Sequence, residues 1–166
     1  MTEKTLPTPE ELRKLLRYEP QTGKLYRLRG EYEIVEAFTS KDTHGYHRGT
    51  INGKALSAHR AIWALVHGEW PPEQIDHING QRDDNRLINL RCVTHSENHK
   101  NRARASNNTS GRTGVRLQKQ TGNWEARIKI HGHYLHLGTF KRFEDAVVAR
   151  EAAEIEHGFH PNHDRL

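Results

Sequence analysis

The sequence contains a single cysteine and no long apolar run, and both shortages exclude classes of protein. Cys92 alone cannot form an intramolecular disulfide or a cysteine-rich zinc cluster. No apolar stretch approaches the roughly 20 residues that a membrane span requires. Residues 1–20 also lack the apolar segment of a secretory signal. We therefore expect a cytoplasmic protein with no membrane partner.

Apolar residues are scarce throughout the chain. They make up 33% of the 166 residues, and the mean hydropathy is −0.96. A chain of this length forms one ordinary domain or two small ones, and this composition gives it a thin core. Local structure or a partner must therefore hold part of the chain in place.

Acidic residues are almost missing from residues 100–129. This stretch has eight Lys and Arg residues against Glu125 alone, a net charge of +7, whereas the whole chain carries +5. The remainder is therefore slightly acidic. Such a concentration of positive charge indicates contact with a polyanion, such as a nucleic acid. Charge alone leaves a solvated basic surface as an open alternative.

Local signals predict helices and strands in the first 70 residues. "TPEELRKLLRY" begins at Thr8 with a capping box and predicts a short amphipathic helix. Residues 23–58 alternate as strands, with the hairpin signal Asn52-Gly53 between two of them. "SAHRAIWALVHG" then has apolar residues at helical spacing and ends at Gly68.

The stretch "EQIDHINGQRDDNRLINLRCVTHSEN", residues 73–98, predicts a β-β-α unit. Two short strands flank a polar loop, and a capping box starts a helix near His95. Asp76 and His77 are neighbours on the first strand, so they point to opposite sides. Asn98 falls one turn into the helix, which can bring it close to Asp76.

These residue types suit metal-assisted hydrolysis. A carboxylate and an amide oxygen are hard ligands that fit Mg²⁺ or Mn²⁺ and leave positions open for water and phosphate. His77 has an ordinary pKa near 6.5, which suits a general base. Taken one at a time, the three residues are better explained in ordinary ways: Asp76 as the cap of a turn, Asn89 in an Asx turn and Asn98 as an exposed helix residue. Their combination with His77 favours an active site.

"DHINGQRDDNRLINLRCVTHSEN" resembles the HNH endonucleases of bacteriophages, and "AHRAIWALVHGEWPP" and "LRKLLRYEPQTGKLYRL" resemble the same proteins. The resemblance implies a ββα-metal (HNH, His-Me finger) nuclease domain over residues 1–104, with its core at about 73–103.

The same resemblance assigns roles to four residues. It implies that His77 is the general base that activates water. Asp76 and Asn98 would hold one divalent ion per active site, Mg²⁺, Mn²⁺ or another. Asn89 would tie down the hairpin loop through bonds to the backbone and so orient His77.

The tail has a pattern of its own. Residues 105–111 are polar and predict a linker. Three strand-like runs and a helix that ends at Gly158 follow, which predicts a small α+β unit. On "GVR", "W-x-A-x-I", "LGTF" and "EDA" this tail resembles the AP2 DNA-binding domain. The resemblance implies a three-stranded antiparallel sheet backed by a helix over residues 112–160, which makes the whole chain α+β.

Several residues are expected to contact DNA. Those that match DNA-facing positions of the AP2 family are Arg112, Arg116, Lys119, Trp124, Arg127, Lys129 and His136. Those outside that domain are Arg60, Arg82, Lys100, Arg102 and Arg104. Two alternatives stay open, because Arg60 can instead pack the start of its helix and Trp124 can be a core aromatic. Arg127 and His136 stand where plant members carry Glu and Trp, so the target sequence is not implied.

We therefore expect a metal-dependent HNH DNA endonuclease of the phage homing type, acting in the host cytoplasm on double-stranded DNA. The oligomeric state, monomer or homodimer, decides whether it nicks or cuts both strands. One alternative is a DNA-binding regulatory protein with an inactive nuclease module. A weaker alternative is an accessory factor in DNA packaging.

Overall fold

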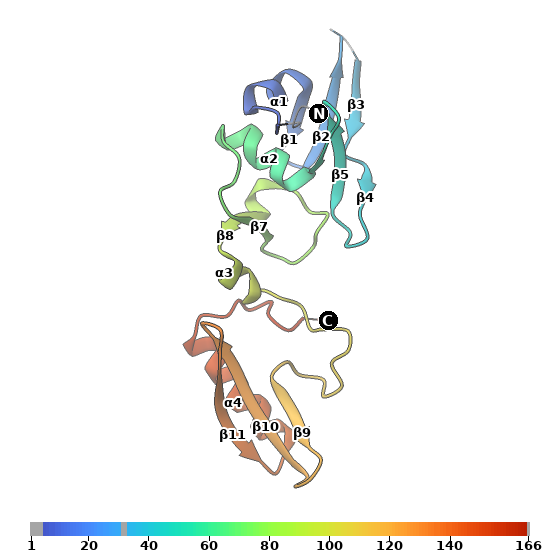
Figure 1. The fold of residues 1–166 in the computed structure, drawn as a ribbon. Coiled ribbons are helices and arrows are strands. Elements are labelled where there is room, and N and C mark those ends of the chain that lie inside the picture. The colour runs from blue at the N-terminus through green and yellow to red at the C-terminus, as the bar shows by residue number, and fades with distance from the viewer. Residues whose placement is uncertain (1–4, 31–32, 166) are drawn as a thin grey trace. The chain divides into compact units, whose positions relative to one another are not determined.

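The computed structural model describes residues 5–30 and 33–165 (Figure 1). The chain divides into two compact units, Met1–His95 and Ser96–Leu166, each with a hydrophobic core of its own. The sequence placed the end of the first domain at residue 104, so the division comes earlier than expected. It falls within a short helix, α3 (His95–His99).

The first unit combines small antiparallel sheets with two helices. One sheet has the order β1-β2-β3 and a second the order β4-β5-β6, while β7 and β8 form a separate hairpin. In chain order the elements are α1 (Pro9–Leu15), β1 (Leu16–Glu19), β2 (Lys24–Arg29), β3 (Glu33–Ala37), β4 (Ser40–Lys41), β5 (His47–Ile51), β6 (Lys54–Ser57), α2 (Ala58–His67), β7 (Gln74–His77), the 3-10 turn η1 (Leu87–Asn89) and β8 (Leu90–Val93).

Two of the expected helix boundaries are confirmed, the start of α1 and the end of α2. Thr8 and Glu11 form both bonds of the capping box at the start of α1. Gly68 ends α2 with φ +77, a conformation that glycine adopts at little cost. The buried face of α2 and Leu12 of α1 belong to one apolar core, which the inner residues of β1, β2, β5 and β6 complete. This core supports the β7–β8 hairpin.

The β1–β2 turn supports the loop that joins β7 to η1. Gly23 in this turn has φ +75, and a Cβ atom there would lie 2.6 Å from the backbone nitrogen of Arg86. Tyr18 of β1 accepts a hydrogen bond from the Leu87 backbone at 2.8 Å and donates one to the Asn85 carbonyl at 3.4 Å. The N-terminal sheet therefore holds Asn85 and Arg86 in place.

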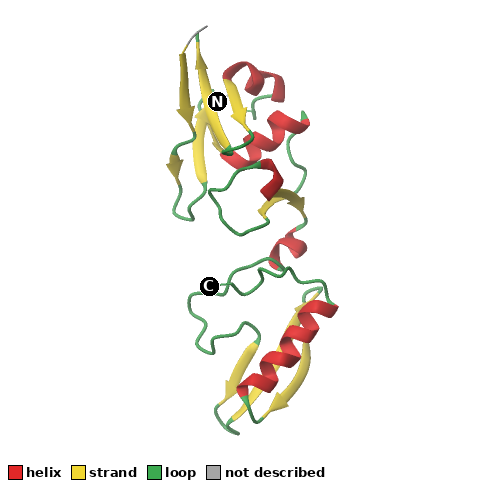
Figure 2. Cartoon of the chain, turned by 180° about the vertical axis from the view of Figure 1, so that it is seen from behind, coloured by secondary structure: helices red, strands yellow, loops and turns green. Residues whose placement is uncertain are grey.

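The second unit is a three-stranded antiparallel sheet of order β11-β10-β9 with one long helix along it (Figure 2). The strands are β9 (Val115–Gln118), β10 (Asn123–Ile130) and β11 (His133–Phe140), and the helix is α4 (Phe143–Glu156). Ala146 of α4 packs with Val115 and Ala126 of the sheet. The α+β class is confirmed, while membership of the AP2 family stays a prediction.

The flanks of this sheet and helix also belong to the second unit. The backbone of residues 100–104 pairs with the C-terminal segment: Lys100 accepts from His160 at 3.0 Å, Arg102 accepts from Asp164 at 2.9 Å, and Arg104 donates to Arg165 at 2.9 Å. The unit is therefore longer at both ends than the expected 112–160.

In the part of the chain that is described, no helix is long and apolar enough to cross a membrane.

Replacing Gly23 by alanine tests the contact between the β1–β2 turn and the hairpin loop. Gly45 is the matched control, because its φ is +86 but a Cβ atom there would meet nothing within 4 Å. The positive φ alone costs an alanine roughly 1–2 kcal/mol, which both variants share. We expect Gly23→Ala to lose about 1–3 kcal/mol more in urea unfolding, because the methyl group collides with backbone. Equal losses would mean that the loop moves aside freely.

Candidate active site

The β7–β8 hairpin positions Asp76 and His77. In its antiparallel register, Asp76 lies opposite Arg91 and His77 opposite Leu90. Both polar side chains are buried, with Asp76 9% and His77 3% exposed. Asp76 contacts Arg91, whereas His77 faces the loop and the aromatic side chains beside it. Buried polar groups need partners, so these contacts define what each side chain can do.

A hydrogen bond to Asn85 decides which nitrogen of His77 carries the proton. The Nε2 of His77 lies 3.2 Å from Oδ1 of Asn85, and the Nδ2 of Asn85 donates to the Asp83 carbonyl at 3.3 Å. Because the amide oxygen can only accept, Nε2 must donate. In the neutral ring Nδ1 then holds the basic lone pair, as a general base requires.

Tyr46 and His59 pack against His77. Their ring centroids lie 5.7 and 5.2 Å from that of His77, and His59 meets it edge to face at 83°. Burial lowers the pKa of His77, and the same cause, reinforced by His77, lowers the pKa of His59 to about 3. Both imidazoles are therefore neutral at pH 7, the form in which a histidine accepts a proton.

Asn89 closes the hairpin loop with two side-chain bonds to the backbone. Its Oδ1 accepts from the Asn79 amide at 2.9 Å, and its Nδ2 donates to the Asp84 carbonyl at 2.8 Å. Asp84 also accepts from Arg86, which lowers the Asp84 pKa to about 2. These bonds connect both ends of the loop that carries Asn85. The effect of Asn89 on catalysis stays a prediction.

Asp76 offers the chemistry that a hard divalent ion prefers. Its carboxylate accepts from the Nε and Nη2 of Arg91 at 2.9 and 2.7 Å, both on Oδ2. Among residues 5–30 and 33–165, no group of three or more His, Cys, Asp or Glu side chains forms a metal cluster. One carboxylate plus an amide oxygen fits an ion that keeps most of its positions for water and phosphate. Asn98 belongs to the second unit, so its pairing with Asp76 stays a prediction.

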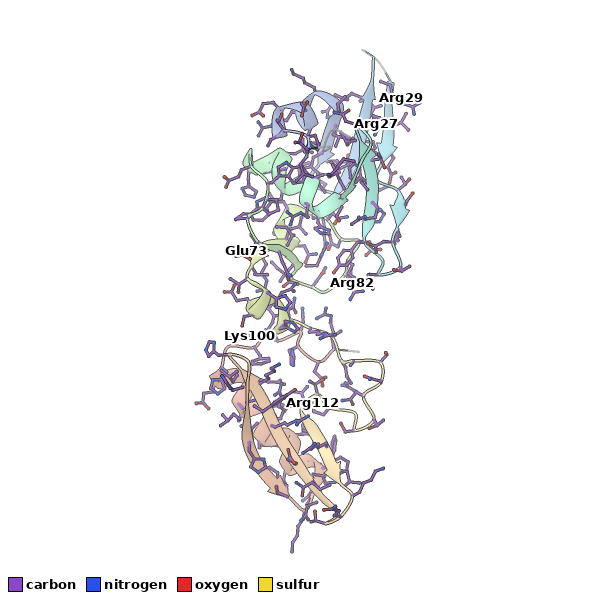
Figure 3. All side chains as sticks on the ribbon, viewed as in Figure 1. Arg27, Arg29, Glu73, Arg82, Lys100 and Arg112 are labelled. Atoms are coloured by element: carbon purple, nitrogen blue, oxygen red, sulfur yellow. The ribbon has the colours of Figure 1, made fainter. Side chains whose placement is uncertain are left out.

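The two arginines expected to contact DNA from the first unit differ in surroundings. Arg60 donates to the carbonyls of Pro71 and Glu73 at 3.3 and 3.2 Å, which favours the packing alternative. Arg82 donates to the His44 carbonyl at 2.8 Å and lies 5.3 Å from the ring of Tyr46 (Figure 3). Since Tyr46 also contacts His77, Arg82 is the better placed of the two to meet a phosphate near the site.

Two residues predicted to contact DNA from the second unit have structural contacts. Arg112 is paired with Glu154 at 2.6 Å and with Asp164 at 3.0 Å, and only 15% of its side chain is exposed (Figure 3). The ring of Trp124 stacks edge to face on Phe143 in the core, with centroids 4.8 Å apart. These contacts favour a packing role for both residues.

The remaining predicted residues are more open. Arg127 and Lys129 lie over the ring of Tyr134, at 4.4 and 5.5 Å from its centre. The exposed members of the set are Arg102, Arg116, Lys119, Lys129 and His136. Arg116 is paired with Glu125 at 2.9 Å, Lys100 donates to the His157 carbonyl at 2.8 Å, and Arg104 contacts Asp164.

Sequence reasoning missed three contributors to the site. Asn85 is only 3% exposed and bonded to His77, although an asparagine in a polar loop gives no signal of such a contact. Tyr46 and Arg91 carried no signal, because their contacts with the two site residues arise from the tertiary fold and the strand register. The register of the predicted hairpin was the one clue that could have paired Arg91 with Asp76.

Comparison with known proteins bears on this region directly. Residues 57–100 match the family model described as HNH endonuclease. This segment is therefore similar to HNH endonuclease domains. It spans α2, the β7–β8 hairpin and α3, and it includes His77 and Asn85. A match of this kind suggests nuclease activity.

A phage protein is similar to part of the chain. Protein 3.8 of Escherichia phage T7 is 32% identical over 80 residues, which are 48% of this chain and 66% of that protein. No solved structure matches the chain. The HNH match leaves residues 1–56 and 101–166 outside the family model.

The depressed pKa of His59 predicts acid sensitivity of the first unit. An unfolded histidine takes up a proton near pH 6.5, whereas buried His59 does so only near pH 3. Its contribution to stability is therefore present above pH 6.5 and is lost as the pH falls toward 3, with about 2 kcal/mol gone by pH 5. We expect His59→Phe to flatten the fall in unfolding free energy between pH 7.5 and 5.

The exposed His133 provides the matched control for this measurement. His133→Phe is expected to leave the pH dependence as it is in the unaltered chain. A His59→Phe variant that loses stability between pH 7.5 and 5 as steeply as the unaltered chain would show that other groups cause the effect.

Proposed function

We propose that this chain is a metal-dependent HNH DNA endonuclease of the phage homing type. The observation that carries the proposal is the buried, neutral His77, held by Asn85 within the segment that matches the family. A neutral imidazole with a fixed proton on Nε2 suits a general base.

In the proposed reaction, Nδ1 of His77 takes a proton from a water molecule as the water oxygen attacks the phosphorus. The bond from phosphorus to the 3′ oxygen breaks, and the departing oxygen takes a proton from a solvent water molecule, which leaves a 5′-phosphate and a 3′-hydroxyl. Asp76 and Asn98 would hold one Mg²⁺ or Mn²⁺ ion, which supplies positive charge for the phosphate and the departing oxygen when bound. Asn89 and Asn85 keep His77 oriented during the transfer.

Whether one or both DNA strands are cut follows from the number of active sites. One His77 acts on one phosphodiester bond at a time, so a single chain nicks. A double-strand break requires two chains on one site or two successive events.

We further propose that the second unit docks the enzyme on DNA with the sheet face opposite α4. Paired residues of an antiparallel sheet share a face, and the register pairs Arg127 with His136 and Lys129 with Tyr134. The basic side chains and the tyrosine therefore lie together, away from the core. A twisted strand surface of this kind fits the major groove, as the AP2 resemblance implies.

Cleavage of supercoiled plasmid tests the nuclease. We expect the unaltered chain to nick it with Mg²⁺ and not with EDTA. His77→Ala is expected to cut at least about 100-fold more slowly because it lacks the general base, while it still binds DNA. His67→Ala is the control, since His67 is an exposed residue of α2 outside the site. Product bands on an agarose gel give the rates.

The same assay separates the alternative. If the purified unaltered chain binds DNA but never cleaves it with Mg²⁺ or Mn²⁺, the DNA-binding regulator with an inactive nuclease module is the correct description. Cleavage that persists undiminished in His77→Ala would mean that another group is the base.

Salt titration tests the docking face. In a His77→Ala background, we expect Arg127→Gln with Lys129→Gln to lower the slope of log affinity against log salt by about 1–2, because fewer phosphates are neutralised. Lys141→Gln with Arg142→Gln removes the same charge from exposed positions just before α4 and is expected to leave the slope closer to the parent value. Fluorescence anisotropy on a labelled duplex gives the affinities. Equal slopes in both double variants would contradict the proposed face.

A further inference from the structure

The pair formed by Asp76 and Arg91 is an unusual feature of a candidate metal ligand. The two residues are direct partners in the β7–β8 register, so their side chains leave the hairpin on the same face. Both Nε and Nη2 of the guanidinium converge on Oδ2 of the carboxylate, at 2.9 and 2.7 Å. The carboxylate is buried, whereas a third of the Arg91 side chain reaches solvent.

This pair has no net charge, and that matters for a divalent ion. The attraction of a carboxylate for Mg²⁺ is opposed by a guanidinium that already sits on one of its oxygens. Metal sites that bind tightly without substrate usually have several acidic ligands. In the described ranges, 5–30 and 33–165, no three acidic, histidine or cysteine side chains gather in that way. Further negative charge must therefore come from elsewhere.

We propose that Arg91 neutralises Asp76 in the DNA-free protein, so that the divalent ion binds appreciably only together with a DNA phosphate. This inference rests on the proposed function, because it takes Asp76 as a ligand of the ion. The phosphate supplies the negative charge that the Asp76–Arg91 pair lacks. Binding of the ion and binding of DNA are then coupled, and by linkage each strengthens the other by the same factor.

The coupling has a use in a nuclease. A protein that stays nearly ion-free off DNA assembles its catalytic centre only at a phosphodiester bond. The partly exposed guanidinium can leave Oδ2 and turn to solvent or to the incoming phosphate, since arginine bonds phosphate as readily as carboxylate. The carboxylate has no such freedom because it is buried on a short strand.

Titration of Mn²⁺ into the full chain without DNA tests the proposal directly, by calorimetry or by the paramagnetic signal of free Mn²⁺. We expect Arg91→Met to bind Mn²⁺ at least about tenfold more tightly than the unaltered chain, because even water-like screening leaves that much repulsion between a guanidinium and a divalent ion across one carboxylate. Arg91→Lys keeps the charge and is expected to resemble the unaltered chain. Arg91→Gln is a second neutral variant for the case in which Arg91→Met does not fold.

Arg86 offers a matched control. It bonds Asp84 through the same two nitrogens, Nε to Oδ1 at 2.8 Å and Nη2 to Oδ2 at 2.6 Å, but it lies in the hairpin loop. Arg86→Met is expected to leave Mn²⁺ affinity unchanged. If it tightens binding as much as Arg91→Met, the effect reflects overall charge and the proposal is wrong.

Two further readouts separate the possible failures. In a His77→Ala background, Asp76→Asn should abolish the tightening of DNA binding by Mn²⁺. If it does while Arg91→Met leaves Mn²⁺ binding without DNA unchanged or weaker, the proposed site stands and the role of Arg91 is overturned. If neither substitution has its expected effect, the metal site of the proposed function is itself wrong. In a His77→Ala background, Mn²⁺ should tighten binding to a DNA duplex by a larger factor with Arg91 present than in Arg91→Met, and equal factors would also overturn the coupling.

Discussion

The two hydrogen bonds made by the side chain of Asn89 are the constraint on which the site depends. They join the Asn79 amide to the Asp84 carbonyl and so close a loop that has no secondary structure of its own between β7 and η1. Asn85 lies directly after this closed segment, and its amide must hold one orientation to accept from His77. An open loop would let that amide turn, and the imidazole would lose the contact that fixes its proton.

Contacts with the N-terminal sheet also hold this loop in place. Gly23 and Tyr18 both contact the backbone around Asn85, although they lie more than 60 residues away in sequence. The long region before the hairpin thus serves the site without contributing a reacting group. It also brings Tyr46 and His59 against His77 and excludes water from one side of the ring. That burial lowers the pKa of His77. The imidazole is therefore a weaker base, and it is neutral at pH 7.

The sequence predicted those features that local physics determines. Capping residues, the Asn-Gly turn and strand alternation located α1, the β5–β6 hairpin and the sheet of the second unit, because each depends on neighbours within a few residues. The placement of Asp76 and His77 on a strand of a short hairpin was predicted for the same reason. Asn85 and Arg91 could not be assigned a role, since an asparagine in a polar loop and an arginine on a strand are ordinary until the tertiary fold shows what they touch.

The charge count along the sequence is also incomplete, because it includes arginines that are paired with acidic residues in the fold. Arg112 and Arg104 fall in the basic stretch, but Glu154 and Asp164 neutralise them from the far end of the chain. Ion pairs of this kind hold the C-terminal segment against the sheet, and their neutralised guanidinium groups contribute little positive charge to a DNA contact. The positive charge that remains for the proposed docking is therefore smaller than the +7 of residues 100–129, and two of its members, Arg127 and Lys129, lie together over Tyr134. If this face docks on DNA as proposed, so few cations would bind any phosphate backbone only moderately, and dwell time at one site would also require contacts made by the first unit. An ion that binds together with the phosphate would supply one such contact, and it would do so only where the catalytic hairpin is aligned with the DNA strand.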